Sequence, residues 1–191
     1  MVKLIVEEIP PLYMCCDRLI AAVDIASAVR FQNERRRMEH LAWRRIVRRE
    51  LGLDVIIDYN DVGAPVVSQP NRRISVAHGG GMVAVAIADM PVGVDIESLE
   101  RDFSMASSRY MSVEESQLSD DARWSAMVWT AKEAMYKLYG RRGVDLRTEL
   151  QVVDYDASSM VSHGIMGGKQ RVTVEYSLFD ERYVVAVATE R

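Results

Sequence analysis

The sequence predicts an α+β fold made of two similar halves. Three observations point to it: alternating strand patterns, long helical stretches, and the repetition of both in the same order. A strand, two helices and further strands occur in residues 1–90 and again in residues 91–191. We expect a pseudo-twofold relation between the halves, with the functional site in the cleft between them.

The long helices give the clearest sign of repetition. The first is expected at Asn33–Leu51 and the second from about Ala122 to Tyr139, and a glycine follows each. Placing Gly52 over Gly140 aligns the helices without a gap. The alignment also sets Arg44 over Lys132, Arg45 over Glu133 and Arg49 over Lys137. The carboxylate therefore exists only in the second half, and helices that do not superpose would refute the repeat.

The other elements follow from local patterns, because alternation predicts strands and apolar residues at helical spacing predict helices. In the first half we expect a strand at Lys3–Glu8, a break at Pro10 and Pro11, a helix at Asp17–Val29 capped by Asp17, a second cap at Asn33, and strands at Asp54–Tyr59, Arg73–Ala77 and Met82–Ala88. In the second half we expect a strand at Pro91–Glu97, a helix at Arg101–Tyr110, a capping box between Ser112 and Glu115, a mobile loop at Ser158–Gly168, and strands at Gln151–Tyr155, Gln170–Tyr176 and Tyr183–Ala188.

The composition is that of a globular protein, with 191 residues of which 49% are hydrophobic and 27% charged. No apolar run approaches the roughly 20 residues needed to cross a bilayer, and the acidic N-terminus does not resemble a signal peptide. We therefore expect a cytoplasmic protein without membrane attachment. A net charge of −4 argues against general nucleic-acid binding, whereas the arginine-rich stretch 30–49 suits a small polyanion or an acidic partner. The adjacent Cys15 and Cys16 are expected to be reduced thiols.

The strand at Pro91–Glu97 carries the first candidate site. Side chains alternate along a strand, so Gly93, Asp95 and Glu97 share one face. Two carboxylates about 7 Å apart suit a hard divalent cation such as Mg²⁺, with Mn²⁺ as the alternative. Gly93 leaves room on this face for something to approach. The alternative interpretation is a solvated face of an edge strand. The opposite face would carry Val92, Val94 and Ile96.

The second candidate site lies on the helix that precedes Gly140. Residues three and four apart are neighbours on a helix, so Trp129, Glu133 and Lys137 share one stripe, with Lys132 at its edge. Alternatively, Glu133 and Lys137 form only an ion pair on a solvent-exposed surface. An apolar stripe that can face a core consists of Val128, Ala131, Met135 and Leu138.

Together these two stretches resemble the signature of a known family. Gly-Val-Asp-Ile-Glu at 93–97, followed by Trp-x-x-Lys-Glu-Ala-x-x-Lys at 129–137, is similar to the motif pair of the 4′-phosphopantetheinyl transferases. The resemblance is to their larger, single-chain type, and it extends more faintly from about Asn33 to the C-terminus. It implies the pseudo-dimeric fold of that family and a site between the halves. The implied reaction transfers the 4′-phosphopantetheine arm of coenzyme A to a serine of an acyl or peptidyl carrier protein.

The resemblance also implies roles for the acidic residues. Asp95, Glu97 and Glu133 would hold Mg²⁺ against the pyrophosphate of coenzyme A. Glu133, directly or through a water, would help to deprotonate the carrier serine. Lys137 would stabilise the developing charge.

Cations from both halves would bind the phosphates of coenzyme A. Lys132 and Lys137 would stabilise the leaving 3′,5′-adenosine bisphosphate. Arg44 and His78 would hold the pyrophosphate or the 3′-phosphate from the first half. Because a single chain would supply both sides of this site, we expect a monomer.

The sequence also departs from the family's pattern. Ala64 stands where the family usually has a lysine between glycine and proline, and Ala77 stands where a hydroxyl precedes the histidine. Arg36 or Arg37 is the candidate to compensate for early basic residues that the chain lacks. Two other functions therefore stay open: a catalytically weak module that binds coenzyme A or a carrier protein, and a different Mg²⁺-dependent enzyme of phosphate anhydrides.

Overall fold

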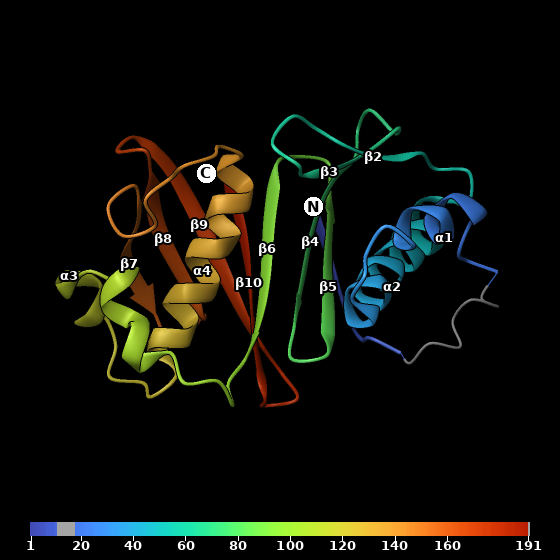
Figure 1. Ribbon diagram of the computed structural model, residues 1–191. Helices are drawn as coiled ribbons and strands as arrows, with labels where there is room; N and C mark the ends of the chain where they lie inside the picture. The colour runs from blue at the N-terminus through green and yellow to red at the C-terminus, as the bar shows by residue number, and fades with distance from the viewer. Residues whose placement is uncertain (11–17, 191) are drawn as a thin grey trace.

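The computed structural model describes residues 1–10 and 18–190 and shows two main β-sheets between helices, beside a small two-stranded sheet (Figure 1). The two main sheets pack against each other through an apolar layer, and a long helix packs on the outer face of each. The predicted mixture of strands and helices is confirmed. The twofold relation between residues 1–90 and 91–191 stays a prediction.

The smaller sheet is formed by the first half of the chain. Among the described residues its strands have the order β1-β5-β4, and neighbouring strands are antiparallel. The short α1 and the long α2 lie on its outer side, where α2 packs on β5. The bounds are β1 Val2–Glu8, α1 Ala22–Ala28, α2 Glu34–Leu51, β4 Arg73–Gly79 and β5 Met82–Ala88.

The larger sheet is formed by the second half. Its described strands have the order β6-β10-β9-β8-β7, so β6 is an edge strand next to β10. The long helix α4 packs along β6 and β10 on the outer face of this sheet. The bounds are β6 Val92–Ser98, α4 Trp124–Tyr139, β7 Leu150–Asp156, β8 Val161–Met166, β9 Gln170–Phe179 and β10 Tyr183–Glu190.

The predicted loop at Ser158–Gly168 is wrong, because most of it forms β8. The composition of this stretch suggested a loop, yet its small residues are the ones that face the core. Ser162 is fully buried and its hydroxyl oxygen accepts a hydrogen bond from the Tyr176 hydroxyl at 3.2 Å. A β-carbon at Gly164 would lie 2.7 Å from the Gln151 carbonyl oxygen, so a larger residue would not fit there.

Shorter elements connect the layers. The predicted helix at Arg101–Tyr110 is the 3₁₀ helix η2, Ser104–Arg109. The capping box is confirmed at the start of α3, Val113–Ser116, where Ser112 and Glu115 exchange hydrogen bonds. The predicted strand at Asp54–Tyr59 is shorter than expected and forms a hairpin, β2 Ile57–Tyr59 with β3 Pro65–Val67.

Local sequence explains the ends of both long helices. The Asn33 side chain accepts a hydrogen bond from the Arg36 backbone N–H, which caps the first turn of α2. Gly52 and Gly140 have φ angles of 108° and 62°, which glycine adopts without a steric penalty. Both predicted helix stops are confirmed.

The layer between the sheets is built by alternation. On β6, Val92, Val94 and Ile96 point into this layer, as predicted. On β5 and β10 both faces are buried, one in this layer and the other under a helix. The edge strand β6 therefore turns its other face, with Asp95 and Glu97, towards α4.

Some predictions lie outside the described residues. These are the cap at Asp17, the break at Pro11 and the state of Cys15 and Cys16; the described helix α1 begins at Ala22. Within the described chain, no helix combines the length and apolarity that crossing a bilayer requires.

Candidate functional site

The acidic face of β6 packs against α4 at close range. A β-carbon at Gly93 would collide with the backbone of Ala134 on that helix. The room that Gly93 provides is thus filled by α4, which corrects the expectation that it leaves open space. Because the helix can come this close, its side chains reach Asp95 and Glu97 directly.

The polar stripe of α4 lies over these carboxylates. The Lys137 ammonium donates to Asp95 Oδ1 and to the Val94 carbonyl oxygen, both at 2.8 Å. The Trp129 indole N–H donates to Glu97 Oε1 at 2.8 Å. Glu133 lies between Trp129 and Lys137 on the same stripe. The alternative of a solvent-exposed pair between Glu133 and Lys137 therefore does not describe this helix.

The site holds more negative charge than its surroundings neutralise. Burial raises the pKa of Asp95, Glu97 and Glu133 above their ordinary values. The Asp95 carboxylate raises the pKa of Glu97 and Glu133 further, and the Glu97 carboxylate adds to the shift at Glu133. Lys137 opposes the shifts at Asp95 and Glu133. A cation that entered this site would lower all three pKa values.

One atom of the site lacks a partner. Asp95 Oδ2 is buried and accepts no hydrogen bond from the described residues. Glu133 likewise forms no hydrogen bond or ion pair with any residue that the structure describes. A buried oxygen without a partner is costly, so Asp95 Oδ2 has unused capacity for a ligand. The part-buried Glu133 carboxylate is likewise not committed to a partner among the described residues.

The three carboxylates have the right chemistry for Mg²⁺ but are not drawn together around a common point. Oxygen ligands are the ones that Mg²⁺ prefers. Within the described residues, however, no group of three His, Cys, Asp or Glu side chains is arranged to hold a metal ion. Lys137 and Arg101 instead provide positive charge at Asp95 and Glu97. The donor set fits the ion, and closure around it requires these side chains to move.

His78 reaches this region from the first half. It lies near the end of β4, about half-exposed, and it favours the ionised form of Asp95. Its Nδ1 is 3.4 Å from Glu39 Oε2. His78 also lines a pocket of 280 Å³ whose walls are Phe31, Arg36, Glu39, His40, Trp43 and Tyr59. The aromatic rings and Arg36 make this pocket suitable for a flat, anionic ligand.

A second pocket of 240 Å³ spans the two halves. Ala64 and Ser75 line it from the first half, and Tyr136, Lys137 and Arg141 line it from the second. The position at which the sequence lacks the expected lysine is therefore on the wall of a cleft that also contains Lys137.

Arg44 does not face either pocket. Its side chain is 4% exposed, and Nη1 donates to Asp24 Oδ1 at 3.0 Å. Arg48 binds the same carboxylate, and the guanidinium of Arg44 lies over the Trp43 ring, 4.8 Å from its centroid. Arg44 thus fastens α1 to α2, and the prediction that it binds a phosphate of coenzyme A is corrected. Of the two compensating candidates, Arg36 lines the first-half pocket, whereas Arg37 donates to the Phe31 carbonyl oxygen.

Lys132 is also absent from the cleft. Its side chain is fully buried, and its ammonium donates to the carbonyl oxygens of Tyr110 and Leu146 and to Glu115 Oε2, at 2.6, 2.9 and 2.8 Å. Glu115 also accepts from the Val152 backbone N–H at 2.8 Å. Every proton of the ammonium has an acceptor, so Lys132 holds surrounding segments together and has none to offer to a leaving phosphate. This corrects the predicted role of Lys132.

Sequence reasoning missed two contributors. Arg101 pairs with Glu97, and the four-residue spacing of these opposite charges was a visible signal. Glu39 pairs with His78, but no local pattern links residues so far apart in the chain. The first could have been proposed from the sequence and the second could not.

Carboxylates on β6 and α4 beside a lysine that also lines the pocket between the halves are the groups expected of a site for metal-bound phosphates. The sequence profile of the 4'-phosphopantetheinyl transferase superfamily matches residues 91–188, which include Asp95, Glu97, Glu133 and Lys137. This chain belongs to that superfamily.

A relative supports the same assignment. The chain is 30% identical over 156 residues to the 4'-phosphopantetheinyl transferase psf-1 of Bacillus pumilus. The aligned part is 72% of this chain and 61% of the relative, so the chain spans about three fifths of that protein's length.

Proposed function

We propose that this protein transfers the 4′-phosphopantetheine arm of coenzyme A to a serine of an acyl or peptidyl carrier protein. The observation that supports this most directly is the meeting of β6 and α4, where Asp95, Glu97 and Glu133 lie with Lys137 in the region that matches the superfamily. The finer assignment, to a single-chain enzyme whose halves are related by a pseudo-twofold axis and which acts as a monomer, is part of the proposal.

The proposed metal ligands are Asp95, Glu97 and Glu133. The partnerless Asp95 Oδ2 and the raised pKa values of all three groups support this choice. Bound Mg²⁺, or Mn²⁺ in its place, would neutralise charge on the pyrophosphate of coenzyme A.

Glu133 is the proposed base for the carrier serine. The serine oxygen forms a bond to the β-phosphorus, the bond from that phosphorus to the bridging oxygen breaks, and 3′,5′-adenosine bisphosphate leaves with the bond's electrons. The serine proton passes to a Glu133 oxygen, directly or through a water. Burial and neighbouring carboxylates raise the pKa of Glu133 in the metal-free site. A bound cation would lower it again, so the role of base rests on the position of Glu133 and not on its pKa.

Lys137 and His78 are the proposed phosphate ligands, one from each half of the chain. Lys137 contacts Asp95 and lines the pocket between the halves, so its ammonium can stabilise charge on the transferred and leaving phosphates. His78 is half-exposed and lines the first-half pocket together with Arg36, which replaces Arg44 as the proposed phosphate ligand of the first half.

A second candidate is a non-catalytic module that binds coenzyme A or a carrier protein. The observation in its favour is the small number of cations that face the cleft, because Arg44 and Lys132 are buried in ion pairs and Ala64 replaces a lysine. The loss of these cations would lower the affinity for coenzyme A, but it leaves the groups around Glu133 intact.

Intact mass of an apo acyl carrier protein separates the two candidates. Incubation with this protein, coenzyme A and Mg²⁺ should add about 340 Da to the carrier, the mass of the phosphopantetheine arm. EDTA should abolish the gain, and Glu133→Gln should nearly abolish it. An unchanged mass across several carriers, together with coenzyme A binding in calorimetry, would favour the non-catalytic module.

A further inference from the structure

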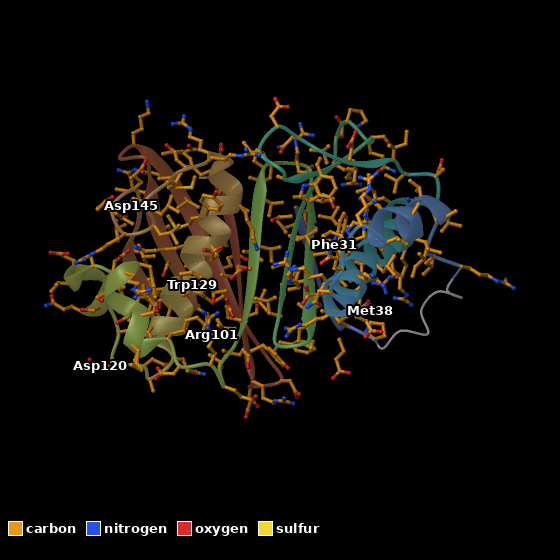
Figure 2. The ribbon with its side chains drawn as sticks, viewed as in Figure 1. Phe31, Met38, Arg101, Asp120, Trp129 and Asp145 are labelled. Carbon is orange, nitrogen blue, oxygen red and sulfur yellow. The ribbon has the colours of Figure 1, made fainter. Side chains whose placement is uncertain are left out.

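Arg101 lies over the acidic site from its open side. Its Nη1 is 3.3 and 3.4 Å from the two carboxylate oxygens of Glu97. Its guanidinium lies 4.7 Å from the ring centroid of Phe103 and 5.9 Å from that of Trp129. Figure 2 shows Arg101 next to Trp129 of α4. The side chain is 59% exposed, so it can leave without unpacking the core.

Both carboxylate oxygens of Glu97 have partners in these contacts. Oε1 accepts from the Trp129 indole N–H, and Arg101 is within reach of both oxygens. A divalent cation that used Glu97 as a ligand would need at least one of these oxygens and would meet the positive charge of Arg101 at close range. Arg101 and the cation therefore compete for the same carboxylate.

We propose that Arg101 is a built-in competitor of the divalent cation, which leaves Glu97 when the metal binds. This inference rests on the metal site proposed above. It also explains why the three carboxylates have suitable chemistry but no closed arrangement: an internal guanidinium neutralises Glu97 while the metal is absent.

The two internal cations of the site differ in how easily they can be displaced. Lys137 is 28% exposed and forms two hydrogen bonds of 2.8 Å. Arg101 is 59% exposed and its contacts with Glu97 are longer than 3.2 Å. The Phe103 ring lies closer to the guanidinium than the Trp129 ring does, so an aromatic face is available to the side chain when it leaves Glu97. Arg101 is thus the side chain that moves, and Lys137 stays on Asp95.

Calorimetric titration of the full chain with MgCl₂, without coenzyme A, tests the competition. Arg101→Ala should bind Mg²⁺ about two- to fivefold more tightly than the unaltered protein, the range expected for removal of a largely exposed ion pair. Arg101→Gln, which keeps a long polar side chain but no charge, should show the same direction. Both variants should melt as cooperatively as the unaltered protein.

Arg182 provides a matched control for the loss of one positive charge. It is 57% exposed, pairs with Glu100 at 3.5 Å and lies over the Tyr183 ring, but it contacts none of the three site carboxylates. Arg182→Ala should change the Mg²⁺ affinity less than Arg101→Ala. Tryptophan fluorescence gives a second readout, because metal at Glu97 perturbs the Trp129 hydrogen bond; the signal should vanish in Trp129→Phe.

The outcomes separate this inference from the proposed function. One result would overturn the competition and keep the metal site. In it, Glu133→Gln weakens the Mg²⁺ affinity, and Arg101→Ala leaves that affinity unchanged or weakens it. Equal tightening by Arg101→Ala and Arg182→Ala would also overturn it, because the effect would be one of net charge. An absence of Mg²⁺ binding in the unaltered protein and in every variant would overturn both the competition and the proposed metal site.

Discussion

The long helices α2 and α4 carry aligned cations that have the same structural task. The alignment that places Gly52 over Gly140 also places Arg44 over Lys132. Arg44 is buried against Asp24 of α1, and Lys132 is buried against Glu115 of α3. Each long helix therefore fastens the short helix that precedes it. The positive charge at the two aligned positions therefore serves an ion pair within each half. The expectation that both side chains bind one ligand between the halves is wrong.

The helices differ one position further on, and this difference creates the site. The same alignment places Glu7 of β1 over Asp95 of β6. In the first half, Glu7 is neutralised by Arg45 and Arg49.

In the second half, Lys137 takes the place of Arg49, but Glu133 takes the place of Arg45. One cation is replaced by a carboxylate, so an ion-pair cluster becomes a site with more negative than positive charge. The comparison supports the proposed repeat and gives a physical reason for placing the proposed metal site in the second half.

The largest expected effect is on transfer by Glu133→Gln. Turnover should fall about 10²–10⁴-fold, because the substitution removes both the proposed base and a metal ligand while it preserves the shape of the side chain. Mass spectrometry of the carrier measures turnover, and circular dichroism checks the fold. Near-normal turnover would mean that Glu133, the residue by which α4 differs from α2, is not needed for the reaction.

Lys132→Ala tests the structural task of the aligned cations. We expect a loss of about 3–5 kcal/mol in the free energy of unfolding, because Glu115 would stay buried without its partner. Arg44→Ala should cost less, about 1–3 kcal/mol, because Arg48 still binds Asp24. Urea denaturation measures both.

Adding Glu115→Gln to Lys132→Ala should restore part of the stability, since it removes the unpaired charge. A Lys132→Ala variant that is stable but binds coenzyme A poorly would contradict this structural role. It would instead support phosphate binding by Lys132.

Ala64→Lys tests the contribution of the first half to the cleft. The new ammonium would line the pocket that contains Lys137 and Arg141, and it should tighten coenzyme A binding about three- to tenfold through a charge-assisted contact with a phosphate. Calorimetry measures the affinity, and Ala64→Met controls for side-chain length. Weaker binding would mean that repulsion from Lys137 and Arg141 outweighs the gain.

The smallest expected effect is a pH-dependent gain in stability from Glu133→Gln. Burial raises the pKa of Glu133 above its ordinary value of 4.5, so the folded protein holds this proton more tightly than the unfolded chain does. Without metal, stability from this group therefore rises as the pH falls through the raised pKa, and it is lost above that pKa. Glu133→Gln should raise Tm by about 2–4 °C at pH 7.5.

The gain should disappear below the ordinary pKa, where the carboxyl is neutral in both states. Thermal melts of the metal-free protein at several pH values would show this trend. A gain of equal size at low pH would mean that packing, and not charge, explains it.

The sequence alone determined the features that depend on short-range periodicity. Alternation placed Asp95 and Glu97 on the face of β6 opposite the core, and helical spacing placed Trp129, Glu133 and Lys137 on one stripe. The caps and stops of the long helices also followed from single residues, Asn33, Gly52 and Gly140. These features are local because the period of a strand or helix fixes which side chains are neighbours.

The tertiary structure alone decided which charges are available to a ligand. No residue near Arg44 or Lys132 in the sequence marks either side chain as buried, yet both are buried with partners many residues away. Conversely, small residues in β8 hid a strand whose inward face is covered by α4 and the neighbouring strands. Burial and ion pairing depend on segments that meet only when the chain folds, so no local pattern could assign these roles.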